Sequence, residues 1–127
     1  MPTRSLRSPV LRWPDRDEVM SAVDGWARRL VSTAPVVAVG VFGSYLRGDW
    51  GVGSDVDLVV IVSNADAPFW ARSLDYDATG LPVPADVLVY TEDEWAAMER
   101  EGRGPARERV EWIAARAGRW PISGGPV

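Results

Sequence analysis

Apolar and polar residues alternate along the chain in patterns typical of helices and strands. Asp15 and Glu18 have the spacing of a capping box, and apolar residues then recur every three or four positions, which predicts an amphipathic helix over residues 15–32. Two apolar runs rich in β-branched residues follow, at residues 36–42 and 56–62. Such runs are typical of buried strands, so two strands are expected here.

The region after the second strand contains the signals of a short helix and a third strand. Asp66 and Pro68 are placed like an N-cap and an early helical proline, and they predict a short helix through residues 69–74 that residues 80–82 terminate. The apolar run at residues 85–90 predicts a third strand.

The last third of the chain predicts two helices and a tail. Thr91 and Glu94 form a second capping box ahead of an apolar helix face. Gly104 and the proline after it predict a final helix that runs to Gly118. Residues 120–127, rich in Gly and Pro, predict a tail with room for one short edge strand.

This element order predicts an α/β or α+β fold with a small sheet. A chain of 127 residues suits one domain. The domain is expected at residues 15–118, between a flexible basic arm at residues 1–14 and the tail at residues 119–127. Four of the seven tryptophans lie at helical spacing among apolar neighbours and are expected in the core: Trp26, Trp70, Trp95 and Trp112. Trp50 lies in a Gly-rich loop, where it either packs locally or contacts a nucleobase or a partner.

The residue types that are absent exclude several kinds of chemistry. The chain has no His and no Cys, so thiolate sites, zinc fingers and Ser-His-Asp triads are excluded. All 14 basic residues are Arg, which also excludes a Lys Schiff base and a Walker A motif. Any catalysis must use carboxylates, hydroxyls, guanidinium groups, backbone N–H groups or a metal held by oxygen.

The charge and the apolar runs narrow the expected partners. A net charge of -4 and a pI near 4.8 argue against strong nucleic-acid binding. The longest apolar run is far shorter than the roughly 18 residues of a spanning helix, and the start lacks the apolar segment of a secretory signal. We therefore expect a cytoplasmic protein with no membrane partner.

The turn after the first strand is a candidate phosphate site. Gly43 permits close backbone approach, Ser44 adds a hydroxyl, and Arg47 follows one turn later. A strand-to-helix junction of this kind presents free N–H groups to a phosphate. Many Gly-Ser turns serve geometry alone, and that alternative stays open here.

Three aspartates are candidate metal ligands. Asp55 and Asp57 project to one face of the second strand, where their mutual repulsion favours a bound cation. Asp86 heads the third strand and is expected to lie beside them. Oxygen ligands suit Mg²⁺ or Mn²⁺. In the alternative, Asp55 caps a turn and Asp57 faces solvent.

Gly43-Ser44, Arg47-Gly48, the run from Ser54 to Leu58 and the later Asp86 together resemble the DNA polymerase β-type nucleotidyltransferase superfamily, and within it the minimal nucleotidyltransferases. The resemblance covers roughly residues 15–118. It implies a mixed sheet flanked by helices, with the triphosphate at Gly43 and Ser44 and with Arg47 near the phosphates.

The resemblance also implies a mechanism and a partner. Asp55 and Asp57 would bind Mg²⁺, and Asp86 would join the metal site and activate an acceptor hydroxyl that attacks the α-phosphorus of a nucleoside triphosphate, with ATP expected. Minimal members often pair with a HEPN-type toxin, so we expect this chain to be an antitoxin that transfers AMP to the toxin. Two alternatives remain: an antitoxin that only binds, and a nucleotidyltransferase that modifies a small molecule such as an antibiotic.

Overall fold

A four-stranded mixed sheet forms the centre of the molecule, with the strand order β3-β2-β1-β4. The computed structural model describes residues 14–33, 35–48, 55–118 and 120. β1 (Val36–Phe42) runs antiparallel to β2 (Val56–Val62) and to β4 (Glu111–Ala115), whereas β3 (Ala85–Thr91) runs parallel to β2. The predicted α+β fold with a small mixed sheet is confirmed, as are the three predicted strands.

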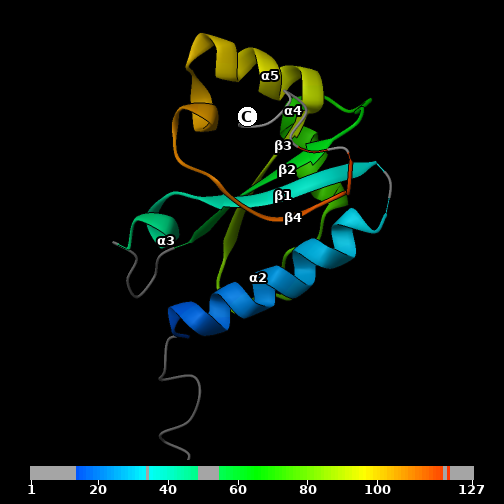
Figure 1. Cartoon of the computed structure of the whole chain (residues 1–127). Helices are drawn as coiled ribbons and strands as arrows, with labels where there is room; N and C mark the ends of the chain where they lie inside the picture. The colour runs from blue at the N-terminus through cyan, green and yellow to red at the C-terminus, as the bar shows by residue number, and fades with distance from the viewer. Residues whose placement is uncertain (1–13, 34, 49–54, 119, 121–127) are drawn as a thin grey trace, which may run out of the picture.

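Two long helices cover the two faces of the sheet (Figure 1). α2 (Arg16–Val31) packs on one face and α5 (Glu92–Glu101) on the other, and both begin with the predicted capping box. All seven residues of β1 are buried, because both of its faces are covered. The core therefore divides into two clusters, the α2 cluster around Val23 and Leu58 and the α5 cluster around Ile61 and Met98.

The shorter helices connect these elements. α3 (Ser44–Arg47) directly follows β1, and α4 (Phe69–Arg72) leads into the 3-10 turn η2 (Ser73–Asp75). Pro68, and not the predicted Asp66, is the N-cap of α4, because its extended backbone directly precedes the first helical residue. The helical segment ends at Asp75, before the predicted stop at residues 80–82. No helix in the described ranges is long and apolar enough to cross a membrane.

The predicted last helix is wrong, because the segment forms the 3-10 turn η3 (Gly104–Arg107) and then β4. Val110 and Trp112 pack in the α5 cluster, whereas Ile113 packs in the α2 cluster on the opposite face. Residues 110–113 thus follow the two-residue period of a strand, and Ala114 departs from it at the register shift opposite Val39 and Gly40. Pairing with β4 provides hydrogen-bond partners for the edge of β1 that β2 does not cover.

The tryptophans divide into core and surface positions. Trp26 and Trp95 are buried as predicted, and Trp112 is partly buried on β4 rather than on a helix. Trp70 is 78% exposed, so its predicted place in the core is wrong: α4 has only 4 residues and none of them is buried. Trp50, the arm up to residue 13 and the tail from residue 121 lie outside the described residues.

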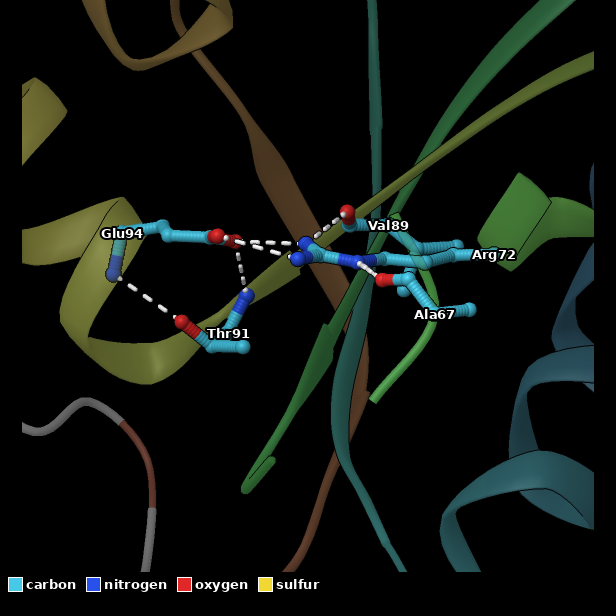
Figure 2. Close-up of polar contacts among 5 residues, drawn as sticks. All are labelled: Ala67, Arg72, Val89, Thr91 and Glu94. Atoms are coloured by element: carbon cyan, nitrogen blue, oxygen red, sulfur yellow. Dashed lines mark hydrogen bonds and ion pairs between the residues drawn. The ribbon is translucent and has the colours of Figure 1, made fainter. Parts of the chain in front are cut away.

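Arg72 joins α4, β3 and α5 (Figure 2). Its guanidinium donates to the main-chain oxygen of Ala67 at 2.9 Å and of Val89 at 3.3 Å, and it pairs with both carboxylate oxygens of Glu94 at 2.7 and 3.1 Å. Glu94 also accepts from the Thr91 N–H at 2.8 Å as part of the capping box. These contacts lower the pKa of Glu94 below its ordinary value, with the Arg72 hydrogen bonds as the largest cause.

Candidate active site

Asp57 and Asp86 lie side by side on adjacent strands. They are register partners in the parallel pairing of β2 with β3, so their side chains project from the same face of the sheet. Val59 and Ile61, which continue the Asp57 side of β2, pack in the α5 cluster. The two carboxylates therefore lie on the face that carries α5, at the end of the sheet where β2 and β3 begin.

Gly43 lies against the Asp57 carboxylate. Phe42, the last residue of β1, pairs with Asp57, and the next residue turns away with φ 81° and ψ -150°. A Cβ on Gly43 would overlap the Asp57 carboxylate. Only glycine adopts this backbone readily and leaves room for the acid, so the turn and the carboxylate form one site.

Three neighbouring carboxylates act on Asp57. Burial raises the pKa of the Asp57 carboxyl most, and the charges of Asp86 and Glu108 add to the rise. Asp55 contributes less, and Arg47 acts in the opposite direction. A half-buried carboxylate among like charges is costly to ionise, and a bound cation would relieve that cost.

Arg47 and Glu108 lie near Gly43. Arg47 Nη1 is 3.6 Å from Glu108 Oε1, and both line a pocket of about 350 Å³ that reaches Gly43 and also contains Arg109. The backbone of α3 is held by α2, since Arg16 Nε donates to the Tyr45 carbonyl at 3.1 Å. The two arginines place positive charge next to the turn, as phosphate binding requires.

The six predicted site residues are only partly assembled. Gly43, Ser44 and Arg47 share one turn, and Gly43 adjoins Asp57. The Ser44 hydroxyl has no hydrogen-bond partner among the described residues. Asp55 is exposed just before β2. No group of three or more potential ligands in the described part of the chain is placed to hold a metal ion.

The residues present nevertheless fit a magnesium ion. Mg²⁺ usually takes one or two protein carboxylates and completes its shell with water and substrate phosphate. Asp57 and Asp86 supply such a pair on adjacent strands, and the Asp57 carboxylate occupies the room that Gly43 leaves by having no Cβ. The donor set is oxygen only, which suits a hard cation.

The sequence profile of the nucleotidyltransferase domain family matches residues 25–113, from the middle of α2 into β4. This chain belongs to the nucleotidyltransferase domain family. All six candidate site residues lie within the matched range. As a nucleotidyltransferase the chain is a transferase, and its acceptor is left open by the match.

The fold of this nucleotidyltransferase is similar to a solved structure. The crystal structure of a proposed nucleotidyltransferase from Sulfolobus solfataricus superposes with a TM-score of 0.58 at 17% sequence identity, covering 80% of this chain and 84% of the other. At that identity the likeness concerns the fold alone. No curated protein matches the sequence.

Glu108 and Arg109 are site residues that the sequence analysis missed. Both follow η3, in the segment predicted as helix. Their place beside Gly43 depends on β4 pairing with β1, which brings residues 108–111 next to the end of β1. Only the alternation of Val110 and Trp112 with polar residues pointed to that strand.

Proposed function

We propose that this nucleotidyltransferase transfers AMP from ATP to a hydroxyl of a partner protein in a magnesium-dependent reaction. The observation that carries the proposal is the pairing of Asp57 with Asp86 on adjacent strands, together with the contact of Asp57 with the Gly43 turn. This arrangement puts one carboxylate of the pair against a backbone turn where a phosphate can approach closely.

The phosphates would lie at the Gly43 turn. The Ser44 hydroxyl can donate to a phosphate oxygen, and Arg47 can move its guanidinium from Glu108 to the triphosphate, because a 3.6 Å contact between exposed groups is weak. Asp55, Asp57 and Asp86 would hold Mg²⁺, or Mn²⁺ in its place. The ion would supply positive charge at the phosphate oxygens.

The proposed transfer needs only the nucleotide, the acceptor hydroxyl and the groups of this site. The acceptor oxygen forms a bond to the α-phosphorus, and the bond from that phosphorus to the bridging oxygen breaks, so that pyrophosphate leaves with the electron pair. Asp86 accepts the proton of the attacking hydroxyl at a carboxylate oxygen. Positioning and charge stabilisation supply the rest, since phosphoryl transfer needs neither His nor Cys.

The proposed acceptor is a toxin of the HEPN type, which makes this chain an antitoxin. The resemblance to the minimal nucleotidyltransferases supports this acceptor, and a tyrosine hydroxyl meets the chemistry. The cytoplasm is the proposed location, because ATP and Mg²⁺ are both available there.

The test is calorimetric titration with ATP, CTP, GTP and UTP, each with and without Mg²⁺. We expect Mg²⁺-dependent binding of ATP that Asp57→Asn abolishes, because the substitution removes a metal ligand. Asp66→Asn is the matched control: it removes the same charge beyond the other end of β2, and it should bind ATP like the wild type. Equal binding by Asp57→Asn would overturn the assigned site. A folded wild type without nucleotide binding would favour an antitoxin that acts by binding alone.

A further inference from the structure

A groove of about 790 Å³ runs beside β3 and reaches Asp86. Its walls are β3 itself and the segment 73–84 that leads from η2 into the strand. β3 is the end strand of the sheet, so this groove follows an open edge. The groove therefore connects a sheet edge to one of the two paired acids.

The main chain of β3 faces the groove at alternate residues. The Val56 N–H donates to the Pro84 carbonyl at 3.0 Å, so Pro84 directs its main chain toward β2, and alternation in a parallel pair gives Asp86 the same direction. Ala85 and Val87 then direct their N–H and C=O groups outward. Among the described residues these outward groups have no hydrogen-bond partner.

Two outward groups farther along this edge are already bonded. The Val89 carbonyl, which also points outward, accepts from Arg72, and the Thr91 N–H donates to the Glu94 carboxylate (Figure 2). An added strand can therefore pair with β3 at its first residues without displacing these bonds. Those are the residues next to Asp86.

The outer wall of the groove is fixed in place. Trp26 of α2 donates its indole N–H to the Asp77 carbonyl at 2.9 Å. The N–H and hydroxyl of Thr79 donate to Asp77 Oδ1 at 2.9 and 2.6 Å. One Asp77 oxygen takes both bonds, and the other accepts no hydrogen bond from the described residues, so it is available to a ligand.

The lining of the groove is acidic. Asp77 and Asp86 are ionisable acids in it, and none of the described lining residues is basic. The remaining side chains are mainly apolar, and Leu74 at the rim is 80% exposed. Trp70, one turn earlier, is 78% exposed and extends the apolar surface. Such a lining favours a polypeptide with basic and apolar side chains and disfavours RNA, whose phosphates would be repelled.

We propose that this groove binds an extended, basic segment of the acceptor protein as an added strand on β3, and that the segment brings its hydroxyl to Asp86. The inference rests on the proposed function and names how its acceptor is recognised. Main-chain hydrogen bonds at Ala85 and Val87 supply affinity, as in other cases of strand addition, and Asp77 selects a positive side chain.

The first test measures binding of a short fluorescent peptide with alternating Arg and Val around a central Tyr, without nucleotide or metal. Val87→Pro removes one outward N–H and leaves the inner bonds of the edge strand in place. We expect about a tenfold loss of peptide affinity, the equivalent of one main-chain hydrogen bond. In the wild type, amide resonances of Ala85 and Val87 should shift on titration. Unchanged affinity of folded Val87→Pro, or shifts confined to other residues, would overturn the inference.

A charge variant keeps the test open if the proline variant does not fold. Asp77→Asn retains the oxygen that Thr79 needs and removes the negative charge, and peptide affinity should fall several-fold and more at low salt. Asp75→Asn removes the same charge two residues away, outside the groove lining, and should lower affinity by a clearly smaller factor than Asp77→Asn does. Equal losses in both variants, or tighter binding of a single-stranded RNA than of the peptide, would contradict the proposal. Nucleotide titration of the same proteins separates the proposed function from the proposed groove. Peptide binding without ATP binding would reject the proposed function alone, and ATP binding without peptide binding would reject the groove alone.

Discussion

At the scale of single residues, Gly43 has the strongest conformational requirement in the described site. Its backbone lies in a region that only glycine adopts readily, and a side chain there would meet the Asp57 carboxylate. Substitution therefore has two costs, backbone strain and displacement of an acid.

We expect Gly43→Ala to lower the free energy of unfolding by about 1–3 kcal/mol and to weaken nucleotide binding at the same time. Gly48→Ala is the matched control. Gly48 also has positive φ, at 88°, but a Cβ there meets no atom of the described residues within 4 Å. That variant should cost on the order of 1 kcal/mol and leave nucleotide binding unchanged. Thermal unfolding and calorimetry measure the two effects, and equal nucleotide affinity in both variants would contradict the role of Gly43.

Glu94 gives a stability that depends on pH. Its pKa is lowered in the folded state, so the ionised form favours folding above the ordinary pKa of 4.5, and this contribution is lost as the pH falls through the lowered value. Glu94→Gln should thus be less stable than the wild type at pH 7. Its free energy of unfolding should be lower by an amount on the order of 1 kcal/mol, which thermal unfolding measures.

The difference between Glu94→Gln and the wild type should shrink when both are measured at progressively lower pH below 4.5. Glu99→Gln, on an exposed position of the same helix, is the control and should match the wild type throughout. A stability difference for Glu94→Gln that stays constant down to low pH would exclude the ionised carboxylate as its cause.

At the scale of elements, β4 depends on a glycine in the strand beside it. A Cβ on Gly40 would lie 2.6 Å from Val110 Cγ1 and 2.8 Å from Trp112 Cε3. Both side chains cross β1 at this position, so they need the surface that glycine leaves bare.

Gly40→Ala should therefore destabilise the fold by about 1–3 kcal/mol through overpacking, and Gly40→Ala combined with Trp112→Leu should recover part of the loss. Gly25→Ala in α2 is the control, because among the described residues its Cβ would meet only Arg29 Nη1, at 3.5 Å, and alanine favours a helix by about 0.5–1 kcal/mol. Urea unfolding measures all three. A neutral Gly40→Ala would show that β4 can shift away from β1.

The sequence could predict a structural feature when the residues that cause it lie close together along the chain. The capping boxes at Asp15 and Thr91 rest on residues three positions apart, and both are present. β4 was missed because its cause is the open edge of β1, far away along the chain. In the site, the two-residue spacing of Asp55 and Asp57 could be read from the sequence. The contact of Gly43 with Asp57 and the proximity of Glu108 to Asp57 depend instead on strand register.

At the scale of the whole molecule, the two clusters share one sheet. Because every residue of β1 and nearly all of β2 is buried between the two layers, loss of either layer would expose the sheet. The two layers should therefore unfold together in a single transition.

Leu58→Ala and Ile61→Ala test this on one strand. Leu58 faces the α2 cluster and Ile61 the α5 cluster, and each truncation should cost about 2–5 kcal/mol. In each variant, far-UV circular dichroism and tryptophan fluorescence should give the same midpoint. A midpoint that differs between the two probes in either variant would mean that one layer unfolds before the other.

The register of β2 with β3 has a consequence for how such chains can diverge. Asp57 and Asp86 meet through strand pairing, so the number of residues in the connection between their strands does not set the distance between them. That connection can lengthen or shorten, and the groove wall within it can be exchanged, without moving the acids apart. An insertion between Asp55 and Asp57, in contrast, would send one of them to the opposite face of the sheet. Length variation among homologues should therefore concentrate at residues 63–84, and a search that fixes the spacing of all three acids would overlook true relatives.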